Sequence, residues 1–224
     1  MLEKTSVQGT TRVIIDTSPD LREQMLSTNV SEIDGVWYTH EHADHTHGID
    51  ELRVFFLRQR KRVPLWADTP TAHMLMNRFA YCFVSPEGSD YPPIVEHRLI
   101  TAGTEIETQG QGGALSSLPF VVHHGNIEAL GFRIGNVAYT PDVNGVPDSS
   151  IKHLEDLDIW IVDALRPKPH PSHFSLPETL SWIERMKPKQ AIITNMHIDL
   201  DYESLRQTLP PNVTPAYDGM TFEA

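Results

Sequence analysis

The sequence has little cysteine, no long apolar stretch and few basic residues. Its 224 residues include a single cysteine, Cys82, which excludes an intramolecular disulfide and a cysteine-rich zinc module. No apolar run approaches the about 18 residues that span a bilayer, and no apolar segment typical of a signal peptide follows Met1. We therefore expect a cytoplasmic protein with no membrane partner.

Lysine and arginine number 18 against 30 aspartates and glutamates, which gives a formal charge of -12. A surface this acidic repels the phosphate backbone, so a long nucleic acid is not an expected partner. Hydrophobic residues make up 39% and charged residues 21%, as in ordinary globular proteins. Histidine, in contrast, is abundant with 12 residues, and it is the side chain that most often binds metals and exchanges protons near neutral pH.

Strand-like and helix-like segments alternate along the chain, and no linker divides it. Apolar and β-branched runs predict strands at 11–15, 35–38, 63–67, 116–122, 130–134, 136–139, 157–162 and 190–194, with β-rich structure over 92–106. Apolar periodicity and capping residues predict helices at 21–26, 49–57, 71–83, 149–157, 176–186 and 202–209. This alternation predicts an α/β fold with helices packed on sheets.

Four potential metal ligands follow the second predicted strand. The segment at 39–45 reads THEHADH and supplies His40, His42, Asp44 and His45. Imidazole and carboxylate ligands suit divalent zinc, manganese or iron. Four donors this close together cannot easily serve one ion. We therefore expect two divalent ions, His40 and His42 on one and Asp44 and His45 on the other, bridged by a carboxylate from elsewhere.

The motif resembles the His-x-His-x-Asp-His signature of the metallo-β-lactamase superfamily. That resemblance implies a four-layer αββα sandwich with the metals at one edge between its two sheets. It also implies a further histidine ligand, which the segment VVHHG at 121–125 supplies as His124, with His123 as the alternate. The bridging aspartate of the family corresponds to Asp142, in the segment VAYTPD at 137–142.

The last ligand of the family is a histidine in a Thr-His pair at the end of a late strand. Here Thr194 is followed by Asn195, and a histidine appears only at His197. On an extended backbone, residues two apart face the same side, so His197 is the expected ligand of the second metal. The alternative is that Asn195 faces the metal.

Five further segments resemble the PhnP-type phosphodiesterases, whose namesake opens 5-phosphoribosyl 1,2-cyclic phosphate. They are 15–22 (IDTSPDLR), 47–53 (HGIDELR), 129–134 (ALGFRI), 199–202 (DLDY) and 217–220 (YDGM). This resemblance implies a hydrolase of a small, cyclic phosphodiester or nucleotide-like substrate, which a hydroxide bridging the two metals attacks. The namesake also holds a structural zinc on an early cysteine cluster, which is not expected here because Cys82 stands alone.

The same branch has a non-ligand histidine that protonates the leaving oxygen, and His173 occupies that position. We expect His173, Asp44 and Asp142 to form the catalytic group. The alternative for His173 is a helix-entry residue, because Ser175 and Glu178 form a capping box just beyond it. Asp163 is the candidate to orient a metal-bound histidine. Arginines that could hold substrate phosphate are Arg53, Arg58 and Arg166.

We expect one domain over residues 1–224 that lacks the first strand and the Gly/Ser-rich loop with which the resembled family begins. The fold alone does not determine the substrate. A lactone, a thioester or an RNA 3′ end on the same two-metal site is therefore an alternative, as is a non-catalytic metal- or nucleotide-binding relative. The oligomeric state stays open between a monomer and a homodimer.

Overall fold

The structure is a computed structural model in which residues 1–223 are described. The chain forms two compact units, Met1–Ser116 and Ser117–Ala224. One domain over 1–224 stays a prediction, and its last residue, Ala224, lies outside the described residues. Among the described residues, no helix has the length and apolar character needed to cross a membrane.

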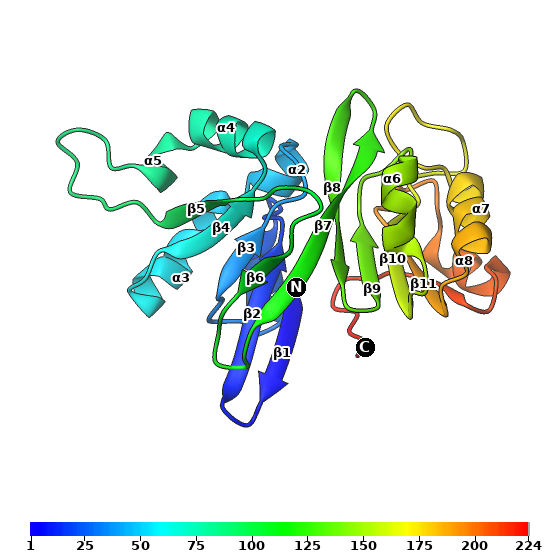
Figure 1. Ribbon diagram of the computed structural model, residues 1–224, viewed down its shortest axis with the longest axis horizontal. Coiled ribbons are helices and arrows are strands. Elements are labelled where there is room, and N and C mark those ends of the chain that lie inside the picture. The colour runs from blue at the N-terminus through cyan, green and yellow to red at the C-terminus, as the bar shows by residue number, and fades with distance from the viewer. Residues whose placement is uncertain (224) are drawn as a thin grey trace. The chain divides into compact units, whose positions relative to one another are not determined.

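The first unit is built on a five-stranded sheet with the order β1-β2-β3-β4-β5 (Figure 1). An antiparallel hairpin of β1 and β2 begins the sheet, and β2 to β5 run parallel. The strands are β1 (Leu2–Ser6), β2 (Gly9–Ile15), β3 (Gly35–Trp37), β4 (Val63–Ala67) and β5 (Val95–Leu99). Because β2 and β3 are parallel, the residues that follow them lie at the same edge of the sheet.

Short helices connect these strands. They are α1 (Leu21–Ser27), α2 (Ala43–Thr46), the 3-10 turn η1 (Ile49–Glu51), α3 (Leu52–Gln59), α4 (Thr69–Arg78) and α5 (Ala80–Phe83). A short strand, β6 (Ile106–Thr108), follows β5 in the chain. Helix α4 begins two residues before the predicted start at 71, because the Asp68 carboxylate accepts the Thr71 N–H at 3.0 Å and Pro70 in the first turn needs no donor partner. The helices cover a core that includes Val36, Leu65 and Phe55.

The second unit contains a sheet in which strands lie in the order β12-β11-β10-β9-β8-β7 (Figure 1). Strands β7, β8 and β9 are antiparallel neighbours, whereas β9 to β12 run parallel. The strands are β7 (Leu115–His124), β8 (Ile127–Ile134), β9 (Val137–Thr140), β10 (Ile159–Asp163), β11 (Gln190–Thr194) and β12 (Val213–Pro215). The parallel strands β9, β10 and β11 therefore bring three successive loops to one edge.

The second unit's helices are α6 (Asp148–Ile151), the 3-10 turn η2 (Lys152–Leu154), α7 (Leu176–Met186) and α8 (Tyr202–Thr208). Helix α7 has the predicted capping box: the Glu178 carboxylate accepts the Ser175 N–H at 2.8 Å, and the Ser175 side chain accepts from the backbone N–H of Glu178. Buried Thr179 and Ile183 face the core of this unit, which also includes fully buried Trp160.

Predicted and observed elements agree closely at β4, α7 and β11, where apolar runs have clear ends. Three short elements were not predicted: β1, β12 and the single turn α2 inside the histidine motif. The polar sequence of β1, LEKTS, has no apolar face, and its pairing with β2 is what makes it a strand. The predicted helix over 71–83 is two helices that meet at Phe79.

Candidate functional site

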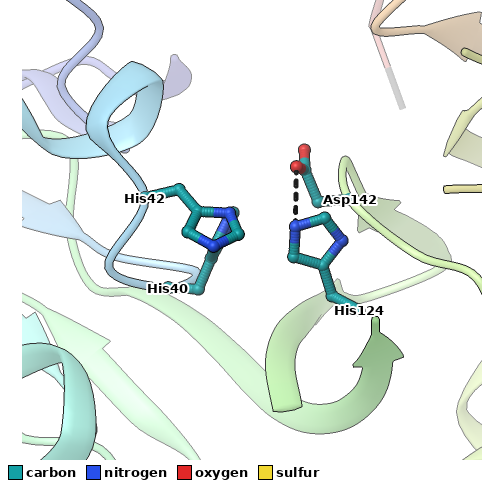
Figure 2. A group of neighbouring side chains, drawn as sticks. All are labelled: His40, His42, His124 and Asp142. Atoms are coloured by element: carbon teal, nitrogen blue, oxygen red, sulfur yellow. Dashed lines mark ion pairs between the residues drawn. The ribbon is translucent and has the colours of Figure 1, made fainter. Parts of the chain in front are cut away.

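His40 and His42 lie in the loop that follows β3. Their ring centroids are 4.7 Å apart, and each offers a nitrogen within 4.8 Å of the other's (Figure 2). His40 is fully buried, whereas His42 is exposed. The Thr39 hydroxyl donates to the Asp16 carboxylate and therefore accepts from His40 Nδ1, at 2.9 Å. His40 thus carries its proton on Nδ1, and Nε2 is the nitrogen with the lone pair.

Asp44 and His45 lie on α2, one helical turn that begins directly after His42. His45 Nε2 is 3.5 Å from Asp44 Oδ2, so the two offer a carboxylate and an imidazole nitrogen side by side. The His45 and His40 rings are also close, with centroids 4.2 Å apart. The first unit therefore gathers all four donors of the motif in the region where the sequence places them.

Asp16 orients this motif, and sequence reasoning missed it. Its buried carboxylate accepts three hydrogen bonds, from the Thr39 N–H at 2.8 Å, the Thr39 hydroxyl at 2.7 Å and His45 Nδ1 at 2.8 Å. Because a carboxylate can only accept, His45 holds its proton on Nδ1 and directs Nε2 away from Asp16. The N-cap of α1 is Asp20 rather than Asp16, so Asp16 is not tied to the start of that helix.

The backbone of Asp16 is left-handed, with φ 60. That conformation is uncommon for a residue with a side chain, although aspartate and asparagine tolerate it better than most. The signal that could have identified Asp16 is its position after a strand that neighbours β3, because parallel strands deliver such residues to one edge.

In the second unit, His124 ends β7 and Asp142 follows β9. His124 Nε2 is 3.4 Å from Asp142 Oδ2, the ion pair that Figure 2 marks with a dashed line. Both side chains are buried, and His124 Nδ1 donates to the carbonyl oxygen of Ser172 at 2.6 Å. Nε2 is therefore the lone-pair nitrogen here too. His123 is exposed, so the structure places His124 rather than its alternate beside Asp142.

His173 is held by Asp163, the last residue of β10. His173 Nδ1 donates to Asp163 Oδ2 at 2.8 Å, and the same oxygen accepts the Val143 N–H at 3.1 Å. His173 Nε2 faces Asp142, 3.8 Å from Oδ2, and the ring lies 4.7 Å from that of His124. Asp163 was expected to orient a metal-bound histidine; in the structure, the histidine that it orients is His173.

Asp163 is fully buried, and burial raises its pKa to about 6. The hydrogen bond and the charge of His173 oppose that rise because they favour the ionised carboxylate. Its second oxygen, Oδ1, has no hydrogen-bond partner within residues 1–223. The hydrogen bond from His173 Nδ1 is therefore one of the contacts that keep this buried carboxylate ionisable.

Asn195 and His197 occupy different surroundings in the second unit. Asn195, left-handed with φ 60, places its side-chain Nδ2 3.3 Å from Asp142 Oδ1 and 3.4 Å from the carbonyl oxygen of Pro141. His197 is half-exposed, and its Nδ1 is 3.3 Å from Asp199 Oδ2. The structure therefore brings Asn195 to Asp142, and His197 as a metal ligand stays a prediction.

A sequence profile of the beta-lactamase superfamily domain matches residues 11–198. The chain belongs to the metallo-β-lactamase superfamily. The crystal structure of a new diphosphatase from the PhnP family superposes with a TM-score of 0.85 and 36% sequence identity, covering 95% of this chain and 79% of that one. This degree of identity places the chain in the PhnP branch and confirms the predicted fold class.

Two other relatives are more distant. The metallo-β-lactamase-fold protein YhfI from Bacillus subtilis has a TM-score of 0.74 at 17% identity, covering 96% of this chain and 87% of that one, which shows the fold alone. An octanoyltransferase from Porphyromonas gingivalis (strain ATCC BAA-308 / W83) is 28% identical over 212 residues, 93% of this chain. This chain spans 42% of the length of that curated relative.

The donor set of this metallo-β-lactamase chain fits divalent metal ions. Imidazole and carboxylate ligands are the ones that zinc, manganese and iron accept. Metal-binding histidines ordinarily donate their other N–H to a carboxylate or a carbonyl, which fixes the tautomer. His45 does so to Asp16 and His124 does so to Ser172, so each unit holds a histidine prepared in this way.

The arginines expected to hold substrate phosphate are mostly engaged. Arg166 donates to the carbonyl oxygens of Lys168 at 3.2 Å and Pro169 at 2.8 Å, within its own loop. Arg53 lies 3.8 Å from the Asp50 carboxylate. Arg58 is exposed in the last turn of α3. None of these contacts concerns the histidine motif.

Proposed function

We propose that this chain of the metallo-β-lactamase superfamily is a hydrolase that cleaves a small phosphodiester with the help of two divalent ions. His40 and His42 would hold one ion, Asp44 and His45 the other, with Asp142 shared between them and His124 and His197 completing the set. The observation that carries the proposal is the fixed tautomer of His45 and His124, because carboxylate and carbonyl acceptors leave each Nε2 as the metal-binding nitrogen.

Divalent ions bound there would neutralise charge on a phosphoryl group and lower the pKa of water. The chain's own contribution is a positioned acid. His173 keeps Nδ1–H on Asp163, which leaves Nε2 as the atom that carries and delivers a proton. Asp163 holds the ring in this orientation, so that His173 Nε2 could deliver a proton to a departing alkoxide oxygen.

Asn195 has a supporting role in the same proposal. Its amide N–H groups contact Asp142 Oδ1 and the carbonyl oxygen of Pro141, so they hold the carboxylate in one rotamer. A carboxylate that is shared between two ions must keep both oxygens in place. Asn195 is thus compatible with a catalytic site, and it does not require the binding-only alternative.

The substrate class is what the test must decide. The PhnP-family neighbour is named a diphosphatase and the curated relative an octanoyltransferase, so phosphoric anhydrides and octanoyl thioesters belong beside phosphodiesters in one panel. The proposed partner is a small phosphodiester or nucleotide-like molecule. The formal charge of -12 disfavours a long nucleic acid.

The experiment loads metal-free protein with zinc or manganese, counts the bound ions, and measures turnover of bis(p-nitrophenyl) phosphate, a cyclic phosphodiester, a diphosphate ester, a lactone and an octanoyl thioester. We expect two ions per chain and turnover of the phosphoryl compounds. Turnover of the lactone or thioester alone would overturn the proposal. Two bound ions without any turnover would instead support a binding protein.

Variants of His173 and Asp142 test the assigned roles. His173→Asn should lower kcat by roughly 100-fold or more, the range of a lost general acid, while both ions stay bound. Asp142→Asn should lose metal and activity together. Loss of metal from the His173 variant would show that His173 is a ligand rather than the acid.

A further inference from the structure

Asn144 lies in the loop that follows β9, two residues after Asp142. Its N–H donates to the carbonyl oxygen of His123 at 2.8 Å, and the His123 N–H donates to the carbonyl oxygen of Gly145 at 2.8 Å. These two bonds form an isolated antiparallel bridge with the end of β7. The backbone of Asn144 is therefore fixed against β7.

The side chain of Asn144 joins two other segments of the second unit. Oδ1 accepts the N–H of Gly125, the residue after His124, at 3.0 Å. Nδ2 donates to the carbonyl oxygen of Pro171, two residues before His173, at 2.7 Å. An amide suits this place because it offers an acceptor and a donor side by side. One side chain thus connects the turn after β7 with the loop that carries His173.

That turn and that loop are in close contact. The carbonyl oxygen of Ser172 accepts from His124 Nδ1 at 2.6 Å. Gly125 has φ 62, and a Cβ atom placed on it would lie 2.9 Å from Ser172 Cβ, so a larger residue has no room there. The loop is therefore attached to the turn at two successive carbonyl groups, those of Pro171 and Ser172.

The position of His173 depends on these attachments. Its hydrogen bond to Asp163 fixes Nδ1, but one bond leaves the ring free to pivot. The backbone on both sides of His173 must also be held for Nε2 to stay 3.8 Å from the Asp142 carboxylate. The Phe174 N–H holds the following side, on a backbone carbonyl at 2.6 Å. On the preceding side, Asn144 is the attachment that lies outside the proposed ligand set.

We propose that Asn144 is a positioning residue for proton delivery, because it holds the loop so that His173 Nε2 reaches the departing oxygen of the substrate. This inference rests on the proposed function. In that step hydroxide adds to phosphorus, the P–O bond to the leaving group breaks, and the departing oxygen takes the proton from Nε2. Solvent then returns a proton to the imidazole. Asn144 should therefore matter most where the leaving group most needs a proton.

The test compares two phosphodiesters on zinc-loaded protein, diphenyl phosphate and bis(p-nitrophenyl) phosphate. Phenolate is the more basic leaving group and gains from a proton, whereas p-nitrophenolate leaves unaided near neutral pH. Asn144→Ala should lower kcat for diphenyl phosphate by roughly 10-fold or more, and kcat for bis(p-nitrophenyl) phosphate by less than about threefold, with little change in KM. In the His173→Asn background it should cause no further loss, because the group that it positions is gone.

A second readout does not need turnover. The hydrogen bond to fully buried Asp163 slows exchange of the His173 Nδ1 proton with water, so this proton should give a signal in nitrogen-edited NMR spectra. Asn144→Ala should broaden or remove that signal. Asn144→Ser is shorter and can keep part of the bridge, so its kcat should lie between the other two proteins. It also serves the comparison if Asn144→Ala does not fold.

Asn212→Ala is the matched control. Asn212 is exposed and directly precedes β12, so it lies where a strand of the parallel sheet begins, whereas Asn144 follows one. We expect wild-type kcat for both substrates and an unchanged imidazole signal. Zinc content is measured in every variant, because Asn144 also contacts the residue after His124.

Equal loss of kcat for both substrates, or a further loss in the His173→Asn background, would show that Asn144 only supports the fold. Loss of zinc from Asn144→Ala, or an unchanged His173 signal, would also overturn the inference. Failure of the proposed function is a different result: wild-type protein with zinc bound turns over neither phosphodiester. The imidazole signal then still decides whether Asn144 positions His173.

Discussion

Replacing Asp16 by asparagine should weaken metal binding at the histidine motif without moving the backbone. Asparagine has the shape of aspartate and tolerates the left-handed φ of 60 at this position. It keeps one carbonyl oxygen for the Thr39 N–H. Its amide NH₂, however, replaces Oδ2, which accepts both the Thr39 hydroxyl and His45 Nδ1. The Thr39 hydroxyl and His45 Nδ1–H then face the amide NH₂, which cannot accept from them. His45 therefore loses the acceptor that fixes its tautomer.

The expected size of the effect follows from those two bonds. One is an ordinary hydroxyl bond to a carboxylate and the other joins a carboxylate to an imidazole, which together correspond to about 2 to 4 kcal/mol of unfolding free energy. Loss of an acceptor that orients a metal-binding histidine typically costs roughly 10- to 100-fold in metal affinity. The unfolding free energy and the metal affinity should fall together, because the same oxygen, Asp16 Oδ2, accepts both hydrogen bonds.

Urea denaturation of the metal-free protein measures the first quantity, and competition with a zinc chelator measures the second. Asp20→Asn is the control, since Asp20 is exposed and its side chain makes no cap hydrogen bond. Asp16→Ala should be less stable still, because alanine adds the cost of the left-handed backbone. Wild-type zinc affinity in Asp16→Asn would refute the reasoning.

Three further predictions concern stability and reactivity. Because burial raises the pKa of Asp163 to about 6, folding favours the protonated acid, so the unfolding free energy of the metal-free protein should fall as pH rises from about 4 to 6. Asp163→Asn should flatten that slope in urea titrations; an unchanged slope would contradict the assignment. Cys82 is fully buried with its pKa raised to about 12 by burial, so a thiol reagent should label it only after unfolding; rapid labelling of folded protein would show otherwise. Ser175→Ala removes the cap of α7 and should cost about 1 kcal/mol in urea, whereas an unchanged midpoint would argue that the cap is dispensable.

Much of the molecule could be predicted from local pattern. The apolar runs of β4 and β11 and the capping box of α7 determine those elements within the chain itself. The motif at 39–45 identified its donors because so short a segment seldom carries four potential ligands unless it binds metal. The helix over 71–83 was harder, since nothing in its composition shows the break at Phe79.

The rest depends on contacts between segments far apart in the chain. Asp16 reaches His45 across 29 positions, and Asp163 reaches His173 through the loop after β10. Sequence alone could name Asp163 as an orienting carboxylate but not the histidine that it orients.

The left-handed residues Asp16 and Asn195 stand in equivalent places, each directly after a strand, β2 in one unit and β11 in the other. The left-handed backbone restricts which amino acids can replace each residue, whatever the role of its side chain. A saturation library should recover folded protein at both positions with asparagine, aspartate, glycine or histidine, and should lose it with valine, isoleucine or threonine. The substitutions that these two positions accept are therefore limited by backbone geometry as well as by function. We expect the same few residue types there even in a relative that does not bind metal.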